Sequence, residues 1–145
     1  MIYIGGDKYG YGLITFISQY LKNHNIDYQN LGVTSDSQSM GLEGLIPKVV
    51  GKVKEAGENS GILVCGTGVG IEIGANRFKG IRASLCNTPK LAEWARNKDN
   101  ANVLCLSAWE FEPANIEAVL NAWFATQYDG DKDRLKMFST FDEWS

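Results

Sequence analysis

The sequence predicts an α/β domain in which helices cover both faces of a mainly parallel sheet. Five short apolar segments have the length of buried strands, and segments with helical spacing lie between them. Such alternation is typical of parallel sheets, because each crossover between parallel strands usually runs through a helix. At 145 residues the chain has the length of one domain with a substantial core.

Each expected strand ends at a glycine, a cysteine or a serine. The strands cover residues 1–5, 26–32, 61–66, 80–86 and 102–107. Apolar residues with helical spacing define four helix faces between and after them. These faces are Leu13, Phe16, Ile17, Tyr20 and Leu21; Ile46, Val49, Val50 and Val53; Leu91, Trp94 and Ala95; and Ile116, Val119, Leu120, Trp123 and Phe124.

Composition excludes several classes of function. The formal net charge of -3 argues against a general nucleic-acid binder. No apolar run approaches the roughly 20 residues that span a membrane, and residues 1–7 lack the pattern of a secretory signal, so we expect a cytoplasmic protein. The three cysteines and the single histidine have no metal-ligand spacing, and the cysteine count is odd, so we expect no metal and no disulfide framework.

Three loops follow strands in a way that favours a shared site. They cover residues 5–12, 65–70 and 107–113. In parallel sheets, ligands bind at the carboxyl ends of the strands, so these loops should converge. The middle loop combines the thiol of Cys65 with a glycine-rich turn that should open a helix, an environment that favours a reactive thiolate.

The glycine-rich turn predicts a small anion hole. Its backbone N–H groups belong to Gly66, Gly68, Val69 and Gly70, and Thr67 adds a hydroxyl. The alternative is a tight turn in which the glycines only permit unusual dihedral angles. The spacing is neither GxGxxG nor a Walker A loop, which argues against a dinucleotide site. Cys86 and Cys105 lack such a turn and are interpreted as packing residues.

Other polar residues have a functional and a structural interpretation. Asp7 and Lys8 follow the first strand, where they can contact a ligand or form a solvated pair. Asn76 can bind a ligand or cap the short helix before it. Lys98 and Asp99 lie in a polar stretch that an ordinary turn would also explain.

The last segment of the chain is first charged and then aromatic. It can form a short helix that packs on a neighbouring subunit. Its Lys132, Arg134 and Lys136 are either a solvated face or a site for a phosphate or carboxylate. Trp109, in the loop after the fifth strand, can be an interface anchor or a packed residue.

Three motifs carry a resemblance to a known family. GGD after the first strand, GILVCGTGVGIEIGANRFKGIRA in the middle and KDNANVL near the fifth strand resemble the ribose-5-phosphate isomerase B and galactose-6-phosphate isomerase family. The resemblance implies a Rossmann-like α/β/α sandwich with a five-stranded mainly parallel sheet over residues 1–145. It also implies a homodimer or dimer of dimers with active sites shared between subunits, and the tail, about residues 129–145, is expected to pack on a partner.

The resemblance implies an aldose–ketose isomerase that acts on a sugar or sugar phosphate through an enediolate without a cofactor. Cys65 would be the base that moves a proton between C1 and C2. Thr67 and the following backbone N–H groups would stabilise the enediolate oxygen. Asp7 would bind a sugar hydroxyl, and Asp99, which matches an asparagine of the family, would help to hold the substrate.

The chain departs from the family pattern where the substrate is recognised. Lysines at 8 and 98 replace two histidines, the second of which is thought to open the sugar ring. Met40-Gly41-Leu42 replaces Asp-Tyr-Pro, and Trp109 aligns with an arginine. Lys132 and Lys136 align with two arginines of a phosphate clamp. Lysine attracts an anion as a point charge, and at neutral pH it is a poorer acid than histidine.

We therefore expect a substrate other than ribose 5-phosphate. An open-chain substrate such as a tetrulose phosphate would need no ring-opening acid, and a uronate-like sugar acid would suit the lysines. A second hypothesis is a non-catalytic sugar-phosphate-binding subunit of a mixed isomerase complex. A third, a nucleotide-binding domain, lacks the required glycine spacing.

Overall fold

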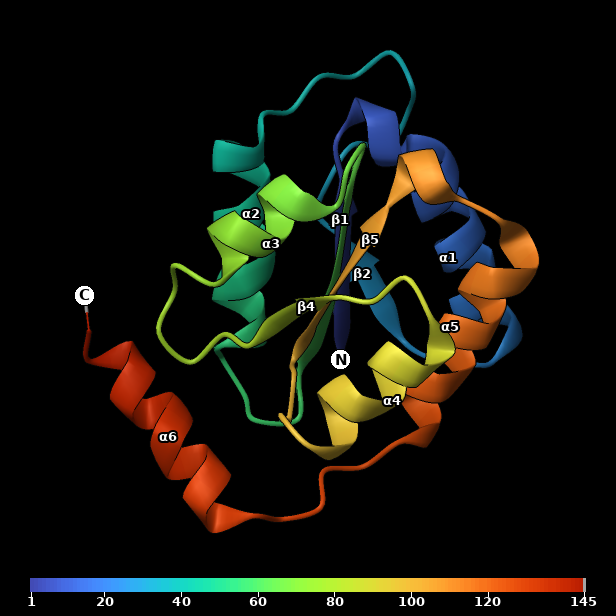
Figure 1. Ribbon diagram of the computed structural model, residues 1–145. Helices are drawn as coiled ribbons and strands as arrows, with labels where there is room; N and C mark the ends of the chain where they lie inside the picture. The colour runs from blue at the N-terminus through green and yellow to red at the C-terminus, as the bar shows by residue number, and fades with distance from the viewer. Residues whose placement is uncertain (145) are drawn as a thin grey trace.

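The computed structural model describes residues 1–144, which form a parallel five-stranded sheet flanked by helices (Figure 1). The strand order is β2-β1-β3-β5-β4, so β1 and β5 flank the central β3. The strands are β1 (Ile2–Gly6), β2 (Tyr28–Asn30), β3 (Ser60–Cys65), β4 (Ala83–Leu85) and β5 (Val103–Ser107). The predicted α/β/α sandwich is confirmed.

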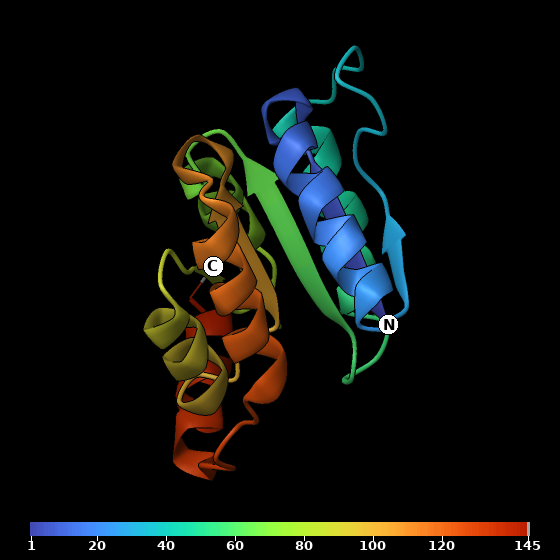
Figure 2. The same cartoon turned by 90° about the vertical axis from the view of Figure 1, so that its right-hand side faces the viewer.

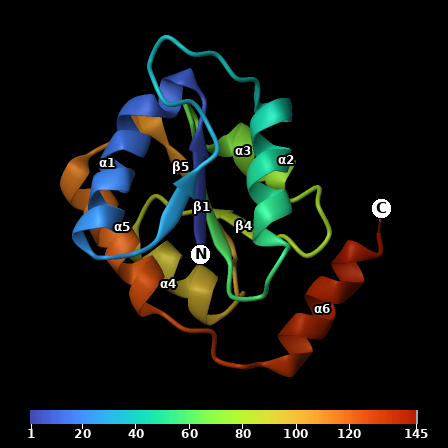
Figure 3. The same cartoon turned by 180° about the vertical axis from the view of Figure 1, so that it is seen from behind.

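Helices cover both faces of the sheet, as Figures 2 and 3 show. One face carries α1 (Tyr11–Asn23), α4 (Pro89–Asn97) and α5 (Pro113–Ala125), and the other carries α2 (Leu42–Val53) and α3 (Val69–Ala75). Two short 3-10 helices, η1 (Lys8–Gly10) and η2 (Ala108–Glu110), follow β1 and β5. No helix of residues 1–144 is long and apolar enough to cross a membrane.

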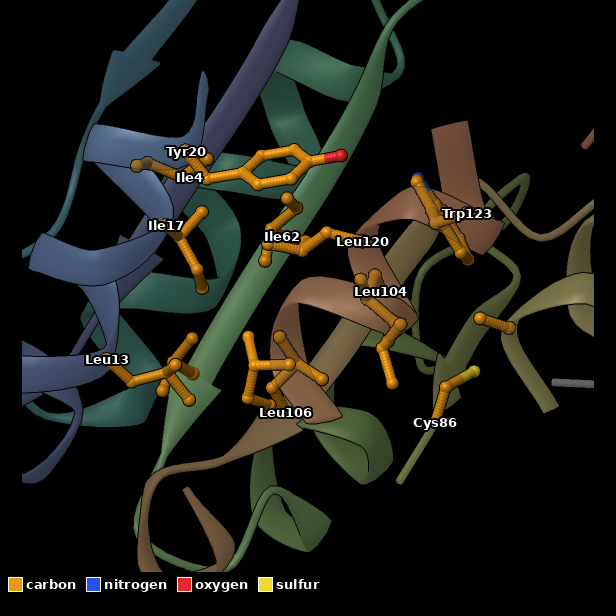
Figure 4. Close-up of a cluster of buried hydrophobic side chains, with 14 of the residues drawn as sticks. Ile4, Leu13, Ile17, Tyr20, Ile62, Cys86, Leu104, Leu106, Leu120 and Trp123 are labelled. Atoms are coloured by element: carbon orange, nitrogen blue, oxygen red, sulfur yellow. The ribbon is translucent and has the colours of Figure 1, made fainter. Parts of the chain in front are cut away.

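The larger core fills the space between the sheet and the three helices α1, α4 and α5 (Figure 4). Side chains of α1, such as Leu13 and Ile17, meet Ile62 of β3 and Leu104 of β5 there. All four are almost completely excluded from solvent. The opposite core joins α2 and α3 to the other side of the same strands. Burial on both faces explains why the central strands read as continuous apolar runs.

Two details differ from the sequence expectations. The outer strands, Tyr28–Asn30 and Ala83–Leu85, are only three residues long, and each pairs with one neighbouring strand. The expected apolar face of α4 is wrong at two of its three positions. Leu91 and Trp94 are 43% and 49% exposed. The helix instead buries Ala92 and Ala95, whose small side chains allow close packing against α5.

The C-terminal helix α6 (Lys132–Asp142) lies beside the body of the domain (Figure 3). None of its residues is fully buried. A cavity of about 470 Å³ separates it from the sheet and includes Phe138, Phe141 and Met137 in its lining. The expectation that the tail packs on a partner subunit stays a prediction.

Candidate functional site

The loops after β1, β3 and β5 meet at the carboxyl edge of the sheet. Two backbone hydrogen bonds join them to the end of β3. Asp7 N donates to the carbonyl of Val64 at 3.3 Å, and Trp109 N donates to the carbonyl of Gly66 at 3.0 Å. The buried hydroxyl of Ser107 donates to the same Gly66 carbonyl at 2.7 Å. The expected convergence of the three loops is therefore confirmed.

Cys65 ends β3 and begins the segment that we call the thiol turn, residues 65–70. Its side chain is nearly buried, with 4% of its surface exposed. The backbone N–H of Gly68 donates to Cys65 Sγ at 3.2 Å, and the Thr67 hydroxyl lies 4.0 Å from the same sulfur. A backbone donor aimed at sulfur stabilises negative charge there, which is what a proton-abstracting thiolate requires.

Glycine is required at position 68 of the thiol turn. Gly68 has φ +76°, a conformation that side chains of L-residues rarely adopt. A Cβ there would also lie 2.7 Å from Leu85 Cδ1 and 3.0 Å from the carbonyl carbon of Leu106. The turn therefore packs directly against β4 and β5, which fixes the direction of its N–H groups.

Two expected donors of the anion hole already have partners within the turn. Gly68 N donates to Cys65, and Val69 N donates to Thr67 Oγ1 at 3.1 Å. Because Oγ1 accepts from Val69, the hydroxyl proton of the exposed Thr67 can be donated outward. The expected binding of substrate by the N–H groups of Gly66 and Gly70 stays a prediction.

Asp7 and Lys8 lie beside the thiol turn, at the start of η1. Asp7 Oδ1 accepts the N–H of Gly10 at 3.0 Å and so caps this short helix. The other carboxylate oxygen can accept from a hydroxyl. Lys8 is exposed, and its Nζ lies 5.2 Å from the centre of the Tyr9 ring. The structure therefore brings Asp7 and Lys8 to the edge where Cys65 lies.

A second group of expected site residues lies at the opposite edge of the sheet. We call it the amino-edge cluster: Lys98, Asp99, Lys132 and Lys136. Lys98 and Asp99 precede β5, whereas Cys65 pairs with Ser107 at its end. A five-residue strand spans about 17 Å. One chain therefore does not bring the amino-edge cluster to its own thiol.

Ion pairs with the tail hold the amino-edge cluster. Lys98 Nζ lies 3.7 Å from the carboxylate of Asp129. Asp99 Oδ1 accepts from Nε and Nη2 of Arg134 at 2.8 and 2.5 Å. These bonds raise the pKa of Arg134 and tie α6 to the loop before β5. The sequence offered Arg134 as part of a solvated face or of an anion site, and it did not predict the bond to Asp99, which is 35 residues away.

Lys132 and Lys136 are exposed on the first turns of α6. Their four-residue separation places them on one face of the helix. They stand on the same helix as Arg134, which Asp99 anchors. Their expected contact with an anion stays a prediction.

The side chain of Asn76 makes two hydrogen bonds within the fold. Its side-chain amide donates to the carbonyl of Ala83 at 2.9 Å and accepts the N–H of the same residue at 2.8 Å. The residue lies at the carboxyl end of α3, whereas the thiol turn lies at the other end. The bridge ties α3 to the edge strand β4, and an additional role in binding stays a prediction.

The other two cysteines belong to the core. Burial raises the pKa of Cys86 and raises that of Cys105 well above its ordinary value. Their interpretation as packing residues agrees with this, because a buried neutral thiol is inert. Among residues 1–144, no group of three His, Cys, Asp or Glu side chains is arranged to hold a metal ion.

Comparison with known proteins identifies the family. The family model described as Ribose/Galactose Isomerase matches residues 2–138. The chain belongs to this family. The Ribose-5-P isomerase B of Listeria innocua is 31% identical to this member over 136 residues, which cover 94% of this chain and 91% of the relative. The predicted resemblance, and with it an enzyme of the isomerase class, is confirmed.

Solved structures agree with this member of the ribose/galactose isomerase family in fold. The crystal structure of ribose 5-phosphate isomerase B from Thermotoga maritima has a TM-score of 0.91 at 32% identity, covering 98% of this chain and 97% of that one. The enzyme of Mycoplasma genitalium, solved with bound ribulose 5-phosphate, has a TM-score of 0.90 at 31% identity. It covers 99% of this chain and 97% of its own length.

Proposed function

We propose that the protein interconverts an aldose phosphate and a ketose phosphate by moving a proton between C1 and C2, with Cys65 as the base. The observation that carries the proposal is the contact of the Gly68 N–H with Cys65 Sγ at 3.2 Å, beside the Thr67 hydroxyl. A carbon next to a carbonyl can lose its proton only where donors meet the charge that develops on oxygen. The thiol turn supplies a base and such donors within one segment.

The proton transfer can be written with the residues of the thiol turn. The Cys65 thiolate takes the proton from C2 of the open-chain aldose. The electron pair of that bond forms the C1–C2 double bond, and the carbonyl oxygen becomes an enediolate oxygen. The Thr67 hydroxyl and N–H groups of the turn other than those of Gly68 and Val69 stabilise this oxygen. The Cys65 thiol then returns the proton to C1, the hydroxyl on C2 loses its proton as the ketone forms, and the oxygen on C1 gains one.

The amino-edge cluster enters this proposal through a second copy of the chain. Because Lys98 and Asp99 lie a strand length from the thiol of their own chain, a complete site needs a partner in a homodimer or dimer of dimers. Asp99 and Asn76 would then contact the substrate, Lys98 would act as the ring-opening acid, and Lys132 and Lys136 would attract its anionic group. The tail helix α6, which carries the last two, would pack on that partner.

The lysines favour a substrate other than ribose 5-phosphate. Lys8 and Lys98 are exposed, and each attracts an anion as a point charge where the family pattern has a histidine. An open-chain tetrulose phosphate or a sugar acid would fit such a site in a cytoplasmic enzyme. A high specificity constant for ribose 5-phosphate would contradict this part of the proposal alone.

The test is a screen of aldoses, ketoses, their phosphates and uronates, with the purified wild type and a Cys65→Ala variant. We expect turnover of at least one sugar by the wild type, and a loss of about a thousandfold or more without the thiol. Calorimetry should show that the variant still binds the same sugar. A wild type that binds sugar phosphates but converts none of them would instead indicate a non-catalytic binding subunit.

A further inference from the structure

Two aromatic side chains stand exposed at the carboxyl edge of the sheet. Tyr9 and Trp109 are 57% and 67% exposed, yet they pack against each other. Their ring centroids are 6.1 Å apart and the rings meet edge to face at 74°. Large aromatic surfaces that remain open beside convergent polar groups are typical of ligand sites.

Local structure fixes both rings. Tyr9 lies on η1, which Asp7 caps through the N–H of Gly10. Trp109 lies on η2, which Ser107 caps by accepting the N–H of Glu110 at 3.3 Å. Each ring therefore projects from a short capped helix directly after a strand, and little conformational freedom of the backbone remains to be lost on binding.

The ring pair spans the end of the central strand. Because β1 and β5 flank β3, rings from the loops after β1 and β5 can meet only across the carboxyl end of β3. A Cβ on Gly66 would lie 2.6 Å from Trp109 Cε2. The indole therefore rests on the residue that directly follows Cys65.

We propose that Tyr9 and Trp109 form an aromatic wall that determines sugar specificity by packing against the C–H face of the carbon chain. The inference rests on the proposed function, since it assigns a role beside the proposed base. Sugars bear C–H groups that pack on aromatic faces, whereas an inorganic anion has no such groups. Lys8, whose Nζ lies 5.2 Å from the centre of the Tyr9 ring, places a positive charge at one end of the wall for the anionic group.

The wall is tested with Trp109→Ala, with Trp109→Phe as the conservative variant and Trp94→Ala as the control. Trp94 is also about half exposed, but it lies on α4, outside the carboxyl-edge loops. Two readouts are compared: the KM and kcat for the sugar phosphate turned over fastest, and competitive inhibition by inorganic phosphate. Inorganic phosphate probes the anion site without a carbon chain.

We expect Trp109→Ala to raise KM about tenfold, with kcat changed by less than about threefold. Inhibition by inorganic phosphate should be unchanged, because phosphate does not touch the wall. Trp109→Phe should retain most of the affinity, Tyr9→Ala should show a smaller rise in KM, and Trp94→Ala should match the wild type.

Two outcomes would contradict the proposed role of the aromatic wall. One is a KM that does not change in Trp109→Ala. The other is an equal loss of affinity for the sugar phosphate and for inorganic phosphate, which would mean that the indole acts through the turn beneath it.

Calorimetry with the tetrose, pentose and hexose phosphates of the screen separates this inference from the proposed function. If the wild type binds one of them but converts none, and Trp109→Ala weakens that binding about tenfold, the isomerase activity is refuted and the aromatic wall is supported. If the wild type turns over a sugar and Trp109→Ala has the same KM, only the proposed role of the aromatic wall is refuted. A wild type that binds no sugar phosphate would overturn both.

Discussion

The thiol turn and the amino-edge cluster are held by different forces. In the thiol turn, backbone groups and buried side chains touch at van der Waals distance, and a Cβ at Gly68 would overlap neighbouring strands. In the amino-edge cluster, ion pairs between partly exposed side chains connect the loop before β5 to the tail helix. The first arrangement is set when the sheet forms, whereas the second depends on solvent conditions.

This difference matches the chemistry proposed for each region. Donors that stabilise a developing charge must stand in place before the reaction, so a rigid turn suits the base. Groups that attract an anion need only charge and reach, which flexible lysines supply. The comparison leads to four predictions, beginning with the largest expected effect.

Gly68→Ala should damage the thiol turn most. The substitution forces a Cβ to within 2.7 Å of Leu85 at φ +76°, and we expect a loss of about 2–4 kcal/mol in the free energy of unfolding together with most of the activity. Urea denaturation and turnover measure both effects. The matched control is Gly130→Ala, which has φ +86° with open space around it and should cost only about 1 kcal/mol. Equal costs at the two positions would show that packing does not constrain the turn.

Ser107→Ala tests the hydrogen bond beneath the thiol turn. The buried hydroxyl donates to the Gly66 carbonyl at 2.7 Å, and its loss should cost about 1–2 kcal/mol in denaturant unfolding. Thr15→Ala is the control, because it removes an exposed hydroxyl that donates to a helix carbonyl and should change stability by less than about 0.5 kcal/mol. A Ser107 variant no less stable than this control would contradict the assignment.

Alkaline pH should weaken the sheet through the buried thiol of Cys105. Burial raises the pKa of Cys105 above the ordinary value of 9.0, so the unfolded chain releases this proton first as pH rises. Stability is then fully present below about pH 9 and falls above it, by about 1 kcal/mol near pH 10 for this thiol. Denaturant unfolding across this range measures the decline, which Cys105→Ala should reduce. A slope that this substitution leaves unchanged would exclude Cys105 as its source.

Asp99→Asn should have the smallest effect on stability. The Asp99–Arg134 pair is partly exposed, at 39% and 44%, so its loss should change the free energy of unfolding less than any of the other substitutions above. High salt should shrink the difference from the wild type, because salt screens exposed charges. Glu93→Gln, which removes an exposed pair within α4, is the control. A loss that resists salt would mean that the amino-edge cluster is as rigid as the thiol turn.

The sequence was sufficient to predict the sheet and the thiol turn, because both follow from patterns of neighbouring residues. Apolar runs ending at Cys65 and Ser107 identify neighbouring strands, and the glycines after Cys65 identify the turn. The burial of α4 could not be read in the same way, since Trp94 has the right spacing but Ala92 and Ala95 face the core. Hydrophobicity alone does not reveal that close helix packing selects small residues.

Contacts between distant residues were also beyond prediction. Nothing near Asp99 in the sequence indicates Arg134 as its partner, and nothing near Trp109 indicates Tyr9, a hundred positions away. Both contacts depend on the three-dimensional order of strands and on where the tail returns. A clue existed for the aromatic pair, since each ring follows a strand whose carboxyl end borders the thiol turn.

The near-complete burial of Cys65 has a consequence for oxidation. Peroxides attack thiolates at a rate that depends on access to the sulfur, and only 4% of this side chain is open to solvent. An oxidant must reach the sulfur through this small exposed part, which the proposed function places against the sugar. A bound sugar would therefore shield the thiol, and oxidative inactivation would be fastest when the sugar is scarce.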